Sequence, residues 1–199
     1  MSTLTNVGFQ RCKVEHAMLY RFDQDVMILV VDVDDITITG NSPRAIKQFK
    51  DNLSSRYGIK DMGSLWWLLG IGIKRDREKR MISFSQTAYI QKIIKHFGME
   101  EAKPLSVPQN PGHNLTKSQS QSDSQAIEEM KCVPYREAMG SLMYAIIRTW
   151  PDIAYAVSYL ARFIANLGRA HWDTVKPIIR YLKGTKDAKV ILGKGGTLS

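Results

Sequence analysis

The stretch Met27-Ile-Leu-Val-Val-Asp-Val-Asp-Asp-Ile-Thr-Ile-Thr-Gly40 decides the fold of the surrounding chain. It begins with an apolar run rich in β-branched residues and ends with Ile36-Thr-Ile-Thr39, whose period of two marks a strand with one buried face. Asp34 and Asp35 lie between the two runs, and Asp favours turns and is depleted in strands. The stretch therefore predicts a tight β-hairpin with two neighbouring carboxylates at its tip.

The paired carboxylates of this hairpin suggest a metal site. Two adjacent negative charges oppose folding unless a cation lies between them, and carboxylate oxygens suit hard ions such as Mg²⁺. We therefore expect Asp34 and Asp35 to be metal ligands. Surface Asp-Asp turns without such a role are common, and an unrelated small-molecule enzyme is a further reading, which requires a deep pocket at Asp34.

The hairpin resembles the catalytic turn of reverse transcriptases, in which an aromatic-x-Asp-Asp motif is usual. Further segments resemble the copia-type retrotransposon polymerase, in that family's order, so the resemblance runs from about Val26 to Thr185. These segments are Ile59-Lys-Asp-Met-Gly63, Trp67-Leu-Leu-Gly-Ile-Gly-Ile73, Ile82-Ser-Phe-Ser-Gln-Thr-Ala-Tyr-Ile90, Phe97-Gly-Met99, Tyr135-Arg136, Gly140-Ser-Leu-Met-Tyr144, Pro151-Asp-Ile-Ala-Tyr-Ala-Val157, His171-Trp172 and Arg180-Tyr-Leu-Lys-Gly-Thr185.

The resemblance implies an α+β fold, with the antiparallel β-hairpins and packing helices of a partial polymerase palm followed by a helical thumb-like bundle. We expect the palm part over residues 1–102 and the thumb-like part over residues 132–185. Residues 103–131 are rich in Pro, Ser, Gln and Gly, which predicts a flexible linker. Residues 186–199 would form a tail.

The residues that follow the Asp-Asp hairpin predict a helix and then a second hairpin. Ser42 can cap a helix that has Pro43 in its first turn, and Gly58 can end it. The apolar stripe of this helix would comprise Ile46, Phe49, Leu53 and Tyr57. After it, the apolar run 65–73 and a strand over residues 81–84 predict a second hairpin, with Trp66 or Trp67 in its core.

The resemblance implies RNA-directed DNA synthesis from deoxynucleoside triphosphates with Mg²⁺, for which Asp34 and Asp35 would be the catalytic and metal-binding residues. The second hairpin resembles the primer grip, so Leu69, Gly70, Ile71 and Gly72 would hold the primer end. The family's first metal-binding aspartate lies upstream of the hairpin, and the first 25 residues offer no counterpart. We therefore expect a polymerase fragment that is inactive alone.

The formal net charge of +9 is concentrated in the C-terminal part, where residues 131–199 hold 11 Lys and Arg against 4 Asp and Glu. Such a surface suits phosphates, although a solvated basic face would have the same composition. Candidate phosphate contacts are Arg162, Arg169, Lys176, Arg180, Lys183 and Lys186. An alternative function is therefore a non-catalytic nucleic-acid binding module derived from a transposable element.

Three residues depart from the family pattern. Asp32 replaces the usual aromatic residue and, by strand alternation, would share a face with Asp34. Trp150 stands where relatives tend to carry Arg. Pro177 falls inside the third thumb-like helix, where a proline costs roughly 3 kcal/mol. These departures resemble drift in a decaying element copy.

The expected partners are an RNA or DNA primer–template, the remaining part of the polymerase and other element-encoded proteins. Two distant cysteines, Cys12 and Cys132, predict a reducing compartment. No stretch reaches the roughly 18 apolar residues that a membrane span needs, and no signal-peptide pattern begins the chain. We expect an intracellular protein, cytoplasmic or nuclear, without a membrane partner.

Overall fold

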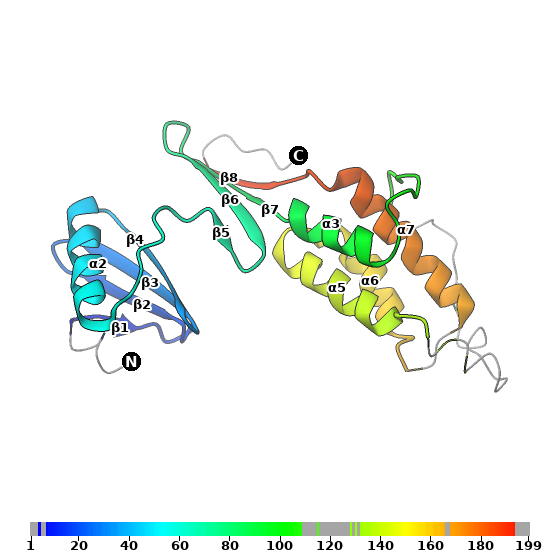
Figure 1. The fold of residues 1–199 in the computed structure, drawn as a ribbon, viewed down its shortest axis with the longest axis horizontal. Coiled ribbons are helices and arrows are strands. Elements are labelled where there is room, and N and C mark those ends of the chain that lie inside the picture. The colour runs from blue at the N-terminus through cyan, green and yellow to red at the C-terminus, as the bar shows by residue number, and fades with distance from the viewer. Residues whose placement is uncertain are drawn as a thin grey trace. The chain divides into compact units, whose positions relative to one another are not determined.

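The computed structural model describes Leu4, residues 7–108, Leu115, Glu128, Met130 and residues 132–165 and 168–193. The described chain has the predicted α+β composition, with antiparallel sheets and helices (Figure 1). It divides into two compact units, Met1–Leu65 and Trp66–Ser199. Each unit has its own hydrophobic core.

The sheet of the first unit is an antiparallel meander. Its strands β1 (Gln10–Arg11), β2 (Met18–Phe22), β3 (Val26–Asp32) and β4 (Asp35–Gly40) are neighbours in chain order. Alternate residues of the strands face a small core, which comprises the buried side chains of Phe9, Leu19, Met27, Leu29, Phe49 and Leu53. The central pair of strands is the predicted Asp-Asp hairpin.

Helix α2 (Pro43–Tyr57) covers this sheet (Figure 1). It starts as predicted, because the Ser42 hydroxyl accepts a hydrogen bond from the Ala45 N–H at 3.3 Å. It ends as predicted at Gly58, whose φ of 64° is the left-handed conformation that glycine adopts without strain. Tyr57 is the exception to the predicted stripe, since its side chain is exposed at the end of the helix.

The sheet of the second unit contains β5 (Trp67–Leu68), β6 (Ile71–Asp76), β7 (Met81–Ser85) and β8 (Val190–Gly193), in that order. The predicted second hairpin is therefore present, but the apolar run is divided by a tight turn between β5 and β6. Neither Trp lies in the core as expected: Trp66 is 68% exposed and Trp67 43% exposed, because the short β5 is an edge strand.

Four helices of the second unit surround its core (Figure 1): α3 (Thr87–His96), α5 (Tyr135–Arg148), α6 (Ala154–Ala161) and α7 (Arg169–Thr185). The short 3₁₀ helix η2 (Pro151–Ile153) leads into α6. Helix α3 contacts α5 and α7, and α6 also contacts both. Within the described residues, no helix combines the length and apolarity required to cross a bilayer.

The two compact units differ from the predicted division into residues 1–102 and 132–185. Helix α3 and the β6–β7 hairpin belong with the C-terminal helices, because Ile90, Ile93 and Ile94 are buried in the same core as residues of α5 and α7. The predicted tail contributes β8, which pairs with β7. Most of the predicted linker 103–131 lies outside the described residues.

The end of α7 is tied to the start of α3. The Thr87 hydroxyl donates a hydrogen bond to the carbonyl of Lys186 at 3.0 Å. Lys186, one of the predicted phosphate contacts, is half-buried at this junction. The segment after α7 is therefore a structural part of the second unit.

Two of the departures from the family pattern lie in the second unit, and one of them, Trp150, is part of its core. Trp150 is 3% exposed and meets the Tyr181 ring edge-to-face, with centroids 6.3 Å apart. Burial, together with a hydrogen bond donated to the Asp152 carboxylate, raises the pKa of Tyr181 to about 12. Pro177 lies within α7 and has no N–H to donate to the Asp173 carbonyl.

Replacing Pro177 with Ala should stabilise the second unit by about 1–3 kcal/mol, because the alanine restores a helical hydrogen bond and removes the ring clash. Urea unfolding followed by Trp fluorescence measures this change, since all four Trp residues lie in the second unit. Pro151→Ala is the matched control. Pro151 occupies a first-turn position where the N–H is not needed, so stability should change by less than about 1 kcal/mol. Equal effects of the two substitutions would contradict this explanation.

Candidate active site

The Asp-Asp hairpin has the geometry that the sequence predicts. Strands β3 and β4 pair with Asp32 opposite Asp35, which leaves Val33 and Asp34 as a two-residue turn. All four residues are exposed. The hairpin therefore presents its carboxylates to solvent from a rigid pair of strands.

The position of Asp32 differs from the sequence expectation. Asp32 does not share a strand face with Asp34, because Asp34 lies in the turn, where strand alternation no longer applies. It lies directly opposite Asp35 on the partner strand. Like charges directly opposite each other on paired strands are destabilising. The negative charge at the end of the β3–β4 hairpin therefore lowers the stability of the hairpin.

Val33 carries the backbone strain of the turn. Its φ is 52°, and its side chain is 89% exposed. A β-branched residue rarely adopts this left-handed conformation, because its Cβ approaches the following carbonyl oxygen. The strain lies directly between the two carboxylate positions, Asp32 and Asp34.

The Asp-Asp turn offers Mg²⁺ carboxylate oxygens, which are suitable donors for this ion. Mg²⁺ is typically bound by one or two carboxylates together with substrate phosphates and water. In the part of the chain that the structure describes, no group of three or more His, Cys, Asp or Glu residues is arranged to hold a metal ion. A metal site that used Asp34 and Asp35 would therefore need further ligands from other groups.

The residues predicted to resemble a primer grip form a tight turn in the second unit. Leu69 and Gly70 have φ values of 48° and 76° and connect β5 to β6. Ile71 and Gly72 follow in β6, opposite Leu68 and Trp67. Two successive positive φ values are characteristic of the type I′ hairpin turn, which explains the need for glycine at one position.

Tyr144, on helix α5, holds this turn in place. Its hydroxyl donates a hydrogen bond to the Leu69 carbonyl, and a Cβ added to Gly70 would lie 3.5 Å from the Tyr144 hydroxyl oxygen. The Tyr144 ring contacts the Tyr89 ring, with centroids 4.9 Å apart, and the guanidinium of Arg148 lies 5.4 Å from its centroid. Sequence reasoning missed this role, because 75 residues separate Tyr144 from Leu69.

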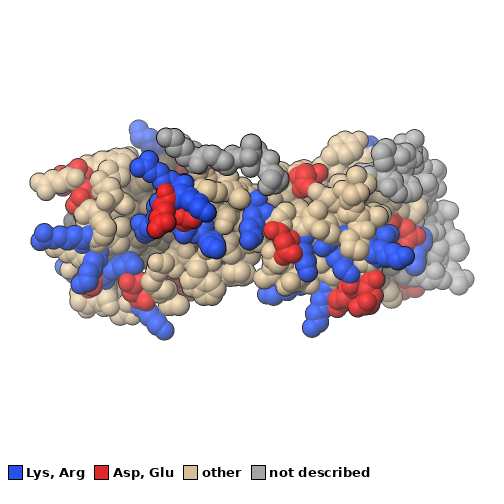
Figure 2. Space-filling model, turned by 90° about the horizontal axis from the view of Figure 1, so that it is seen from above, with Lys and Arg blue, Asp and Glu red and all other residues tan. Residues whose placement is uncertain are grey.

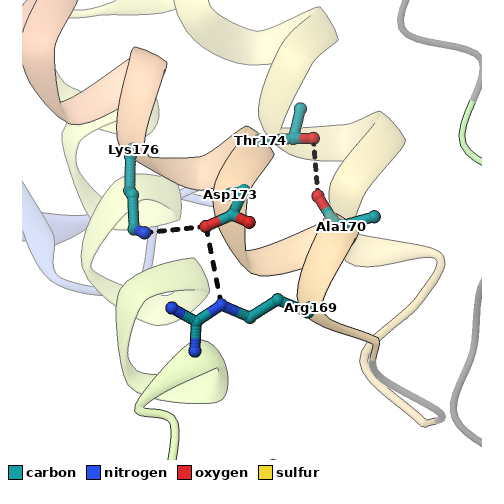
Figure 3. A network of polar contacts seen from close by, with 5 residues as sticks. All are labelled: Arg169, Ala170, Asp173, Thr174 and Lys176. Atoms are coloured by element: carbon teal, nitrogen blue, oxygen red, sulfur yellow. Dashed lines mark hydrogen bonds and ion pairs between the residues drawn. The ribbon is translucent and has the colours of Figure 1, made fainter.

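Three of the predicted phosphate contacts have partners within their own helices. On α7, Arg169 Nε and Lys176 Nζ lie 3.8 and 2.7 Å from the same carboxylate oxygen of Asp173 (Figure 3). The Arg162 guanidinium, next to the end of α6, lies 5.7 Å from the centroid of the Tyr159 ring. The Asp173 carboxylate thus offsets part of the charge of Arg169 and Lys176, whereas the Arg162 contact is with an aromatic face.

Two further predicted contacts fasten a backbone segment to α7. Arg180 Nε donates to the Lys103 carbonyl at 2.6 Å. Lys183 Nζ donates to the carbonyls of Ala102, at 2.9 Å, and Glu100. These side chains therefore have a structural function, and their contact with phosphate stays a prediction.

Val33→Gly should stabilise the first unit by about 0.5–1 kcal/mol, because glycine adopts positive φ without strain, although it loses more chain entropy on folding. Amide hydrogen exchange of β3 and β4 measures this change. Val30→Gly is the control: Val30 lies within β3 and is 39% exposed, so its replacement should destabilise by about 1 kcal/mol. Faster exchange in both variants would contradict the assignment of strain to Val33.

Tyr144→Phe should destabilise the second unit by about 1 kcal/mol and accelerate amide exchange at the β5–β6 turn, because the Leu69 carbonyl loses its donor. Trp fluorescence during urea unfolding gives the free energy. Tyr155→Phe, at a side chain that is 79% exposed, is the control and should change it by less than about 0.5 kcal/mol. Unchanged exchange at the turn would show that Tyr144 does not hold it.

Comparisons with known proteins agree with the resemblance in the sequence. A family model described as reverse transcriptase (RNA-dependent DNA polymerase) matches residues 1–111. The retrovirus-related Pol polyprotein from transposon TNT 1-94 of Nicotiana tabacum is 40% identical over 163 residues, which are 82% of this chain and 12% of the polyprotein. The corresponding polyprotein from transposon RE1 of Arabidopsis thaliana is 36% identical over 176 residues, 88% of this chain and 11% of the polyprotein.

An uncharacterized mitochondrial protein of Arabidopsis thaliana is 33% identical over 163 residues, 80% of this chain and 62% of that protein. No solved structure matches the chain. The chain thus corresponds to about one-eighth of the two polyproteins. The family model and these relatives, together with the Asp-Asp hairpin, establish that the chain belongs to the copia-type retrotransposon branch of the reverse transcriptase (RNA-dependent DNA polymerase) family.

Proposed function

We propose that this chain supplies part of the active site of an RNA-directed DNA polymerase, in which Asp34 and Asp35 bind Mg²⁺. The observation that carries the proposal is the exposed carboxylate pair at the tip of β3–β4 in a chain of the reverse transcriptase family. The substrates would be deoxynucleoside triphosphates and a primer–template. When bound, two Mg²⁺ ions would neutralise charge on the reacting phosphate and activate the primer hydroxyl.

The chain's own residues would contribute position and charge to this site. The β3–β4 pairing fixes the directions of Asp34 and Asp35 outward from the sheet, and the small core beneath α2 holds the pairing in register. Because the described carboxylates do not complete a metal site, we propose that the 199 residues do not polymerise DNA unaided. Further ligands would come from the substrate and from another polymerase segment.

The two other readings of the sequence have less support. A small-molecule enzyme requires a deep pocket at Asp34, whereas Asp34 is exposed in a hairpin turn. A binding module built on the C-terminal basic helices requires available cations, whereas Arg169, Lys176, Arg180 and Lys183 have partners within the unit.

A chimera tests the polymerase proposal. The matching segment of the tobacco polyprotein is replaced by this chain, and primer extension is measured on a primed RNA with Mg²⁺. The chimera should extend the primer, and Asp34→Asn should reduce extension by at least about 100-fold, equivalent to about 2.7 kcal/mol. The reason is that the amide cannot supply the negative charge that a metal site needs.

Asp23→Asn in the same chimera is the control, because Asp23 is an exposed carboxylate in the β2–β3 connection, away from the tip. It should leave extension unchanged, and the isolated 199-residue chain should show none. Extension by the isolated chain would refute the proposed incompleteness. Full activity of the Asp34→Asn chimera would refute the proposed role of the hairpin.

A further inference from the structure

The end of β6 and the turn that follows it form a segment dense in Lys and Arg. Five of the seven residues from Lys74 to Arg80 are Lys or Arg, against two carboxylates. We refer to Lys74, Arg75, Arg77, Lys79 and Arg80 as the basic hairpin tip; all five are exposed. Figure 2 shows Lys and Arg side chains gathered over this turn, with a few Asp and Glu atoms among them.

Most of this charge is not compensated locally. Asp76 accepts a hydrogen bond from the Lys79 N–H at 2.9 Å and lies 4.0 Å from Lys79 Nζ. Within the described ranges, no ion pair joins a carboxylate to Lys74, Arg75, Arg77 or Arg80. The tip therefore differs from α7, where Asp173 and backbone carbonyls engage the basic side chains.

Strand β7, which follows the basic hairpin tip, is hydrogen-bonded to a neighbouring strand on each side. β7 pairs with β6 and with β8, and Met81 lies opposite both Asp76 and Gly193. Gly193 has a φ of 145°, and a Cβ there would lie only 2.3 Å from the Arg80 carbonyl oxygen, so β8 approaches the base of the turn closely. A rigid base means that little conformational entropy is lost there when the tip binds a ligand.

We propose that the basic hairpin tip binds the sugar–phosphate backbone of a nucleic acid strand, without reading its bases. This inference rests on the proposed function for the class of partner. Lys74 and Arg75 point to opposite faces of the sheet by strand alternation, so the tip suits an extended polyanion better than a single small anion. Residues 74–80 contain no apolar side chain to enter a membrane, which favours nucleic acid over an anionic lipid surface.

The test compares two quadruple variants of the full 199-residue chain. The tip variant carries Lys74→Gln, Arg75→Gln, Arg77→Gln and Arg80→Gln. The helix variant carries Arg162→Gln, Arg169→Gln, Lys176→Gln and Lys186→Gln, so both lose four positive charges. Fluorescence anisotropy measures the affinity for a labelled RNA template with an annealed DNA primer, between 50 and 200 mM NaCl.

The tip variant should bind more than about tenfold more weakly, and its slope of log K against log salt should be shallower by about 3. The reason is that each lost phosphate contact removes roughly 0.7–0.9 from the slope. The helix variant should change the slope by less than about 1. The turn variant Arg77→Gln with Lys79→Gln, which leaves the strands unchanged, should give a change of about 1.5 and serves if the tip variant does not fold.

Four results would overturn the inference. Equal losses in the tip and helix variants would indicate an effect of net charge alone, and a loss only in the helix variant would place the contact on α6–α7. Binding of the wild type to phosphatidylserine vesicles but not to the primer–template would assign the tip to membranes. An unchanged slope in the tip variant alongside an active chimera would refute this contact while leaving the polymerase proposal intact.

Discussion

The register of β3 against β4 is the constraint on which the candidate active site depends. Met27 and Leu29 alternate inward to the core, and this alternation fixes which residues of the partner strand lie opposite them. A slip of one residue would turn the buried side chains to solvent, so the core defines the register strongly. With that register, only Val33 and Asp34 remain for the turn. The hydrophobic core thus determines the position of the carboxylates, and the strained φ of Val33 is a consequence.

Local patterns in the sequence predicted those elements whose signals lie within about 15 residues. The Asp-Asp hairpin and helix α2, with its Ser42 cap and Gly58 end, both have such signals. Hydrophobic periodicity and capping reflect backbone geometry within one element. These signals can therefore be recognised without knowledge of the rest of the fold. The location of the Asp34–Asp35 pair could be predicted for the same reason.

The features that escaped prediction involve distant pairs of residues. Nothing near Tyr144 indicates that its hydroxyl would reach Leu69, and nothing in the last residues distinguishes β8 from a tail. The apolar run around Trp67 was also ambiguous, because periodicity alone does not reveal a type I′ turn at Leu69, a residue that rarely adopts positive φ. Tertiary contacts decide these cases, and a single sequence does not display them.

The charge distribution is a second feature that the sequence predicts only in part, because it depends on contacts between distant residues. Summing charges placed the basic excess in residues 131–199, but the sum does not say which cations already have partners. Asp173 pairs with two of them and offsets one of their two charges, and carbonyls from the chain around residues 100–103 engage two more. The basic hairpin tip lies outside that C-terminal range, within residues 1–130, where the Lys and Arg residues are nearly balanced by Asp and Glu. Availability of charge, rather than its amount, distinguishes the two surfaces.

The exposure of the Asp-Asp turn weakens the argument that its carboxylates need a cation in order to fold. In water, two unit charges 4 Å apart repel by only about 1 kcal/mol, whereas the same pair in a protein interior would repel far more strongly. Asp32, Asp34 and Asp35 are all exposed, so the pairing of β3 with β4 and the core beneath it can tolerate their repulsion without a cation. The first unit can therefore fold before a metal or substrate arrives. Under the proposed function, its carboxylates would then already be in position when the metal and the remaining ligands approach.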